Sequence, residues 1–511
     1  MNRPTHPEIA TLGALRRSGY LDVTVKEEMR RNLLRMLKAR EELFPGIIGY
    51  DKTVIPELVN ALLSRHDFIL LGLRGQAKTR ILRGLTRFLD EFIPVIQGTE
   101  TNDHPYHPVS MIGRMKVAEM GDETPIAWVH RDLRYHEKLA TPDVTIADLI
   151  GDIDPIKAAS RKLDFSNEEV IHYGLVPRAN RGIFAINELP DLQPRIQVGL
   201  LNVMQEKDVQ IRGFDVRLPL DVAIVYSANP EDYTNRGNII TPLKDRIDSQ
   251  IMTHYPDDIE AAMAITAQEA WLERGRLIEG ESADGLGAEL KMPDWFRQIV
   301  EEIAFQARES DYVDQNSGVS ARLSITALEN VMSNMERRAL LTGDSPVYPR
   351  VSDLQAAVPS LTGKIELVYE GEQEGPIKVA KYLIGRAVKE VFETYFPDAH
   401  RGKIGKEKEE VATSPYRAIV EWFSQGRKLQ VDGDASDAGY LETLDTVKGL
   451  REIARTFVKT DDPARLGPAM ELVLEGLHQS SILAKEEVEG RVSYLDMLQT
   501  MFAAAPDKGR R

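Results

Sequence analysis

The stretch ILLGLRGQAKT, residues 69–79, decides how the rest of the chain is interpreted. Its apolar run ends abruptly in a loop that contains Gly72 and Gly75. The loop then leads into residues 80–85, whose pattern predicts a helix. A phosphate-binding loop requires this strand–loop–helix context.

The loop meets the pattern G-x-x-x-x-G-K-[ST] at every fixed position except one, where Ala77 replaces the second glycine. The backbone N–H groups of such a loop form an anion cradle. Lys78 would neutralise the β- and γ-phosphates of ATP, and the Thr79 hydroxyl would ligate Mg²⁺. A βα turn with a chance lysine is the alternative, but the adjacent Lys–Thr pair favours nucleotide binding. The predicted nucleotide-binding residues are Gly72, Leu73, Arg74, Gly75, Gln76, Ala77, Lys78, Thr79 and Arg80.

A short apolar segment upstream, FPGIIGY at 44–50, lies between two predicted helices at 23–43 and 54–64. Ile47 and Ile48 could form a wall for the adenine ring. Ordinary packing between the two helices explains the segment about equally well.

The bulk composition predicts a globular protein of two to four domains, because 511 residues are too many for one core. The chain has no cysteine, no unbroken apolar run long enough to span a membrane and no signal-peptide pattern at its start. These features favour a cytoplasmic protein without disulfides or thiolate metal sites. The net charge of −16 makes nucleic acid an unfavourable partner.

A second apolar strand, predicted at 182–186, runs into Asn187 and Glu188. The partner strand of a phosphate loop normally ends in two acids, of which the first holds Mg²⁺ through water and the second polarises the attacking water. Here Asn187 takes the metal position without adding negative charge, and Glu188 is the candidate base. An acid that merely caps the strand end is the less favoured alternative.

A third apolar strand, at 222–228, ends on Asn229, whose amide could orient the hydrolytic water. The segment LKDRID at 243–248 then places Arg246 at an exposed helix end. Such an arginine is usually solvated or paired, but in a ring it could reach the γ-phosphate of a neighbouring subunit.

The remaining segments are assigned more coarsely. Residues 94–181 are expected to be largely irregular, with a β-hairpin at 162–181, and the chain from 256 onward is expected to be helical. Arg322 stands at a helix N-terminus, which is unfavourable for a cation, so it is expected to meet an anion, with an ion pair to a nearby acid as the alternative. A charged linker is expected at 400–408.

Taken together, five motifs resemble those of an AAA+ ATPase: GLRGQAKT at 72–79, GIFAINELPDL at 182–192, SANPEDY at 227–233, LKDRID at 243–248 and GVSAR at 318–322. Further segments resemble the branch formed by MoxR proteins and the ATPase subunit of magnesium chelatase: FPGIIGYD at 44–51, GLVPRANRGIFAINE at 174–188 and QVGLLNVMQEKDVQIRG at 197–213. The resemblance covers roughly residues 40–365.

The resemblance implies an α/β P-loop core with a β-hairpin insert, followed by a helical lid and a helical C-terminal region. The expected domains are 1–40, 41–256, 257–365 and 366–511. It also implies that Asn229 is sensor 1, Arg246 the arginine finger and Arg322 sensor 2. Members of this branch form hexameric rings and remodel a partner, which often carries a von Willebrand A domain; no D-x-S-x-S adhesion motif occurs in this chain, so that partner would be a separate protein.

The leading functional hypothesis is therefore a ring-forming ATPase that remodels a protein partner. A motor subunit of a metal-insertion complex is a second hypothesis, although nothing in the chain recognises a porphyrin. A nucleotide-gated scaffold that hydrolyses ATP slowly is a third, because Asn187 weakens the metal site. A DNA-dependent activator or helicase loader is the fourth, and the acidic balance argues against it.

Overall fold

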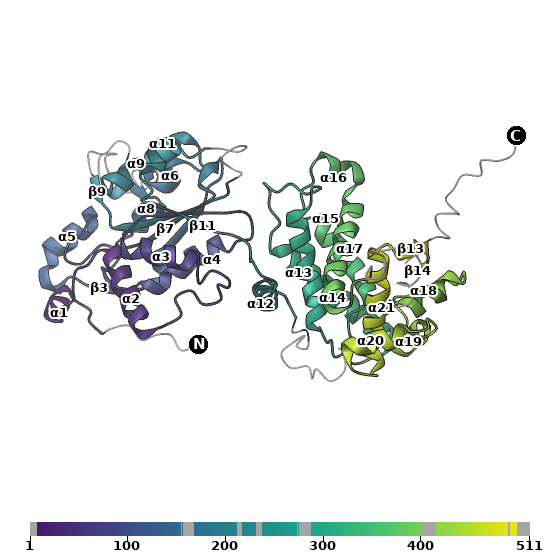
Figure 1. Ribbon diagram of the computed structural model, residues 1–511. Helices are drawn as coiled ribbons and strands as arrows, with labels where there is room; N and C mark the ends of the chain where they lie inside the picture. The colour runs from purple at the N-terminus through teal and green to yellow at the C-terminus, as the bar shows by residue number, and fades with distance from the viewer. Residues whose placement is uncertain are drawn as a thin grey trace. The chain divides into compact units, whose positions relative to one another are not determined.

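The computed structural model of the chain divides into two compact units, Met1–Tyr255 and Pro256–Arg511, which are described separately (Figure 1). The structure describes residues 8–154, 156, 168–211, 217–230, 238–272, 274, 288–399, 414–488 and 491–497. The charged linker expected at 400–408 lies outside these residues. The division into four domains stays a prediction, since the structure separates two units.

The first unit is built on a five-stranded sheet with the strand order β11-β1-β10-β7-β4. Every neighbouring pair in it is parallel, so the carboxyl ends of all five strands lie at one edge. Apolar runs form the central strands because both faces of a parallel sheet are covered. The strands are β1 (Phe68–Leu71), β4 (Tyr135–Leu139), β7 (Gly182–Asn187), β10 (Val222–Ala228) and β11 (Ser249–Met252).

Helices cover both faces of this sheet, and β1 shows how the two cores are divided. Phe68 and Leu70 belong to the core beneath α2 (Val25–Ala39), α3 (Val54–Leu63) and α4 (Lys78–Gly84), while Ile69 and Leu71 belong to the opposite core. Successive residues of a strand point to opposite faces, so one short run contributes to both cores. The opposite core is covered by α6 (Ile146–Leu149), α8 (Leu175–Arg178), α9 (Pro194–Gln205) and α11 (Thr241–Lys244).

The region expected to be irregular, 94–181, contains regular elements, so that prediction was wrong. Strand β4 pairs with β7 as the edge of the main sheet. Its residues are half-buried or exposed, and it therefore lacks the apolar run that reveals a central strand. The region also holds α5 (Met111–Met120) and β3 (Ile126–His130), which pairs antiparallel with β2 (Phe92–Ile96).

A β-hairpin insert is present, but its strands differ from those expected within 162–181. Strand β5 (Gly151–Ile153) pairs antiparallel with β6 (Ile171–Tyr173), so the first strand precedes the predicted segment. Residues 155 and 157–167 lie outside the description. Gly151 has φ +115°, and a Cβ there would lie 2.4 Å from the His172 carbonyl oxygen, so this pairing requires glycine. A second hairpin joins β8 (Asp208–Gln210) to β9 (Arg217–Pro219).

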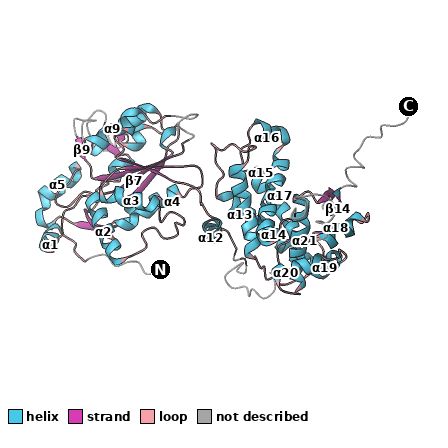
Figure 2. Cartoon of the chain, in the orientation of Figure 1, coloured by secondary structure: helices cyan, strands magenta, loops and turns pink. Residues whose placement is uncertain are grey.

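The second unit is mainly helical, as expected, and has one continuous hydrophobic core that includes buried residues from Trp295 to Tyr494. It also contains a three-stranded sheet, β12-β14-β13, which the sequence analysis missed. Figure 2 labels its central strand, β14. Its helices are α12 (Ile259–Glu269), α13 (Asp294–Glu309), α14 (Arg322–Thr342), η6 (Val351–Ala357), α15 (Val358–Thr362), α16 (Tyr369–Glu374), α17 (Pro376–Tyr395), α18 (Arg417–Ser424), α19 (Asp437–Asp445), α20 (Leu450–Val458) and α21 (Pro463–Gln479).

The missed strands are β12 (Leu429–Asp432), β13 (Leu483–Val488) and β14 (Arg491–Asp496). They are short and rich in charged residues, so they lack the apolar runs of the central strands in the first unit. Alternation is visible in β12, where Leu429 and Val431 are buried and the two residues that follow them are exposed. Among the described residues, none of the helices is both long and apolar enough to cross a bilayer.

Helix α2 is attached to the sheet by buried charges. Glu28 on α2 accepts two hydrogen bonds from the Arg134 guanidinium, both 2.7 Å, and both side chains are almost fully buried. Lys26 pairs with Asp67 at 2.8 Å, and Asp67 also accepts the backbone N–H of Ile224 in β10. Burial raises the pKa of the Asp67 carboxyl, and Lys26 opposes that shift. These contacts link α2 to the residue that immediately precedes β1.

We expect Glu28→Gln to lower the free energy of unfolding by about 3–5 kcal/mol, because it leaves the buried Arg134 charge without its carboxylate. Urea denaturation of the purified protein measures this. Arg31→Gln breaks the exposed 2.6 Å pair with Asp90 and is the control, with an expected loss below about 1 kcal/mol. Equal losses for the two variants would contradict the structural role given to the buried pair.

Candidate functional site

The predicted phosphate-binding loop connects β1 to α4 at the carboxyl edge of the sheet. Gly75 has φ +74°, and Ala77 adopts the left-handed conformation with φ +57° and ψ +11°. This conformation suits glycine and costs another residue about 1 kcal/mol. The chain therefore keeps, with alanine, the backbone path for which the loop pattern normally uses glycine.

Lys78 is the first residue of α4, and its side chain is buried over the loop. Its ammonium group donates hydrogen bonds to the carbonyl oxygens of Gly72 and Leu73, the latter at 3.0 Å. Thr79 and Arg80 follow on the helix and are exposed. The structure thus places the Lys78 ammonium group against the loop carbonyls, with Thr79 as the next residue of the helix.

The loop is held from the β11 side by residues that the sequence analysis missed. The Thr253 hydroxyl donates to the Gln76 side-chain oxygen at 2.7 Å, and the Tyr255 hydroxyl donates to the Arg74 carbonyl at 2.9 Å. A Cβ on Gly72 would lie 1.8 Å from the Thr253 hydroxyl, so only glycine fits there. Thr253 follows β11 directly and Tyr255 comes two residues later, so polar residues after a strand end were the available signal.

The segment predicted to contact adenine also reaches the loop, through a tyrosine. The Tyr50 hydroxyl lies 2.8 Å from the His254 carbonyl and 3.1 Å from the Gln76 carbonyl. Ile47 and Ile48 are half-buried, and Ile47 packs against the core under α2 and α3. Their role in adenine binding stays a prediction, whereas Tyr50 is a direct support of the loop.

The second predicted motif lies at the tip of β7, two strands from β1. Asn187 is the last residue of that strand and is buried, and Glu188 follows in the left-handed conformation with φ +56°. Ser227 of β10 holds both residues, because its hydroxyl donates to the Asn187 side-chain oxygen at 3.2 Å and accepts the Glu188 N–H at 3.4 Å. Ser227 was also missed, since a serine inside an apolar strand carries no motif.

Asn229 follows β10 directly, and its side chain is buried. Strand β10 lies between β1 and β7, and all three run parallel. The structure therefore brings the phosphate loop, Asn229 and the pair Asn187–Glu188 to one edge of the sheet. Ligands of open parallel sheets bind outside this edge.

Arg246 follows α11 and is oriented by that helix and by α9. Its guanidinium donates to the Gln205 side-chain oxygen at 2.7 and 3.1 Å and to the Pro242 carbonyl at 2.7 Å. All three of these bonds are to residues of α9 and α11, and none is to the phosphate-binding loop.

Arg322 is the first residue of α14, as predicted, and belongs to the second unit. Its side chain is exposed, and no ion pair with a nearby acid occurs for it within the part of the chain that the structure describes. The alternative interpretation of Arg322 is therefore not observed. Its role as sensor 2 stays a prediction.

Comparisons with known proteins agree with the site. Residues 161–250, which include Glu188, Asn229 and Arg246, match the family described as the Sigma-54 interaction domain. The chain is 27% identical over 238 residues to the magnesium-chelatase 38 kDa subunit of Cereibacter sphaeroides, covering 45% of this chain and 64% of that protein. It is 31% identical over 227 residues to the same subunit of Rhodobacter capsulatus, covering 43% of this chain and 59% of that protein.

The alignments span less than two thirds of either curated relative. A structure of the complex between the magnesium chelatase subunits BchI and BchD is also similar, with 19% identity and a TM-score of 0.31, covering 65% of this chain and 98% of that one. The fold is that of a P-loop AAA+ core, a parallel sheet flanked by helices. Over part of its length the chain is similar to magnesium-chelatase ATPase subunits and to the Sigma-54 interaction domain.

We expect Ala77→Gly to raise the free energy of unfolding by about 1 kcal/mol, because it removes the Cβ from a left-handed position. Urea denaturation again gives the measurement. Ala118→Gly, in the interior of α5, is the control and should lower stability by about the same amount. A loss of stability in both variants would show that Ala77 does not carry the backbone strain assigned to it.

Proposed function

We propose that this protein is a ring-forming ATPase that couples ATP binding and hydrolysis to the remodelling of a protein partner. The observation that carries the proposal is the convergence of three groups at one sheet edge: the loop with Lys78 and Thr79, then Asn229, and then Asn187 with Glu188. Phosphoryl transfer to water requires positioning and charge neutralisation, and these residue types supply both.

Each group has a distinct task in that chemistry. Lys78 would neutralise the phosphate oxygens that the loop N–H groups bind. Glu188 would take the proton of the attacking water, and Asn229 would orient that water. Mg²⁺ would add charge neutralisation when bound, with Thr79 and Asn187 holding it. The donor set fits this ion, because hydroxyl and amide oxygens are ligands that Mg²⁺ accepts directly or through water.

Asn187 makes slow hydrolysis the expectation. Its side chain is neutral, and its oxygen already accepts a hydrogen bond from Ser227. The metal would therefore gain less charge compensation than from an aspartate. The same observation supports the nucleotide-gated scaffold as a second candidate function.

The ring and the partner extend the proposal beyond one chain. A hexameric ring would let Arg246 of one subunit reach the γ-phosphate bound by its neighbour, and Arg322 would act as sensor 2. The partner would be a separate von Willebrand A domain protein in the cytoplasm. The sequence relatives are magnesium-chelatase subunits, which keeps a metal-insertion motor as the alternative assignment.

Two substitutions test hydrolysis. Lys78→Ala should weaken ATP binding by at least about tenfold, and Glu188→Gln should keep ATP binding while lowering turnover by about 10²-fold or more. Equilibrium binding of a fluorescent ATP analogue and steady-state phosphate release measure the two effects.

The control is Lys116→Ala, because Lys116 also donates to a backbone carbonyl, that of Gln97, but lies on α5 outside the site. It should leave both binding and turnover unchanged. Turnover that survives Glu188→Gln would contradict the assignment of the base, and tight ATP binding without turnover in the unmodified protein would favour the scaffold.

Asn187→Asp should raise turnover several-fold, because it restores the negative charge at the metal position. The Mg²⁺ concentration required for half-maximal activity should fall at the same time. Asn187→Ala is the control and should not raise turnover. An unchanged rate in Asn187→Asp would show that the missing carboxylate does not limit hydrolysis.

A further inference from the structure

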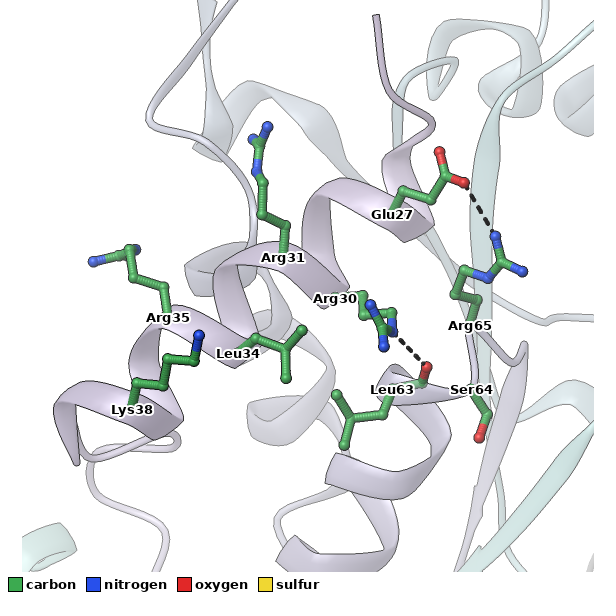
Figure 3. Close-up of a pocket in the computed structure, with 9 residues that line it drawn as sticks. All are labelled: Glu27, Arg30, Arg31, Leu34, Arg35, Lys38, Leu63, Ser64 and Arg65. Carbon is green, nitrogen blue, oxygen red and sulfur yellow. Dashed lines mark hydrogen bonds and ion pairs between the residues drawn. The ribbon is translucent and has the colours of Figure 1, made fainter. Parts of the chain in front are cut away.

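A basic groove lies between α2 and the end of α3, on residues that the proposed reaction does not use (Figure 3). Its volume is about 940 Å³. Five of the nine lining side chains are cationic, and one is acidic. The basic groove is lined by Glu27, Arg30, Arg31, Leu34, Arg35, Lys38, Leu63, Ser64 and Arg65.

This charge is unusual for the chain that carries it. The whole protein has a net charge of −16, yet the groove gathers cations along one helix and adds Arg65 from the segment after α3. Arg30 reaches across from α2 and donates to the Leu63 carbonyl at 3.1 Å, which holds the two walls together (Figure 3). A concave, cationic surface concentrates acidic ligands by its field.

Arg30 and Arg31 are bonded to the Leu63 carbonyl and to Asp90, whereas the other three cations are engaged only weakly by the chain itself. Arg35 lies 3.5 Å from Glu41, and their side chains are 65% and 40% exposed. Arg65 pairs with Glu27 at 3.1 Å, and their side chains are 54% and 45% exposed. Exposed pairs of this kind contribute about 0–1 kcal/mol, so an incoming carboxylate can replace them at little cost. Lys38 has no ion-pair partner among the described residues.

The groove also has an apolar component. Leu34 and Leu63 line the groove and are half-buried. Leu37, three residues after Leu34 on α2, is 39% exposed. None of the nine lining residues is aromatic, so the groove lacks the platforms on which single-stranded nucleic acids stack their bases. Carboxylates together with an aliphatic side chain complement this lining best.

We propose that the basic groove docks an acidic segment of another protein, in which glutamate or aspartate residues flank a leucine-like side chain. The carboxylates pair with Arg35, Lys38 and Arg65, and the aliphatic side chain covers Leu34 and Leu63. The docked segment lies next to Arg65, three residues before the start of β1. The phosphate-binding loop follows that strand. Docking needs no nucleotide, so it is independent of the proposed ATPase activity.

The test uses a fluorescein-labelled peptide of repeated Glu-Glu-Leu units and measures its binding to the full-length protein by fluorescence anisotropy. Binding should weaken as salt rises from about 0.05 M to about 0.3 M, because exposed charges are screened. Arg35→Glu with Lys38→Glu should weaken binding at least about tenfold, and Leu34→Asn should weaken it several-fold.

The matched control is Arg16→Glu with Arg17→Glu. These two arginines lie in the last turn of α1 (Leu12–Arg17), as Lys38 lies in the last turn of α2. Arg16 is ion-paired to Asp122, as Arg35 is to Glu41. Control binding should equal that of the unmodified protein, and so should binding by Lys78→Ala. Unchanged circular dichroism spectra and the milder Arg35→Gln with Lys38→Gln variant separate loss of docking from loss of fold.

Three results would overturn the proposal. Equal weakening by the groove and control variants would show that only overall charge matters. Tighter binding of single-stranded DNA than of the peptide, lost in the groove variant, would assign the groove to nucleic acid. A groove variant that changes the sedimentation of the protein but not peptide binding would assign the groove to a contact between copies of this chain.

Discussion

Parallel pairing of β1 with β10 on one side and β11 on the other is the constraint on which the first unit depends. Backbone hydrogen bonds in this ladder fix where β1 ends, and the phosphate loop begins at that end. The same ladder brings Asn229 after β10 and Thr253 after β11 to the loop's two sides. At the start of β1, Asp67 ties the strand to β10 and to Lys26 on α2. The backbone pairing of the sheet therefore sets the position of the site.

Two left-handed residues at this edge show how the sheet supports local strain. Ala77 and Glu188 both have positive φ, a conformation that costs a side-chain-bearing residue about 1 kcal/mol. Residues from other elements stabilise the two turns. Tyr50, before α3, and Thr253, after β11, hold the loop around Gln76, and Ser227 in β10 holds Asn187 and Glu188. The residues proposed to act on nucleotide are thus kept in place by partners that carry no motif themselves.

The sequence was sufficient to predict the strands and helices whose residue pattern is set by burial. β1, β7 and β10 were predicted because strands covered on both faces are continuous apolar runs, and α2 was predicted from its amphipathic period. β4 and β11 were not, because edge strands are short and partly polar. The same reason explains the missed sheet in the second unit. Supports such as Ser227 and Tyr50 act through contacts distant in sequence, which neither spacing nor composition reveals.

The central claim is that the loop at residues 72–79 holds the phosphates of ATP while Asn187, Glu188 and Asn229 face the γ-phosphate. A crystal structure with Mg²⁺ and a non-hydrolysable ATP analogue tests it most directly. The account predicts phosphate density against the loop N–H groups, with Lys78 turned from the Gly72 carbonyl to the phosphates and the metal beside Thr79. Analogue bound elsewhere on the protein, with Lys78 still bonded to the loop carbonyls, would contradict it.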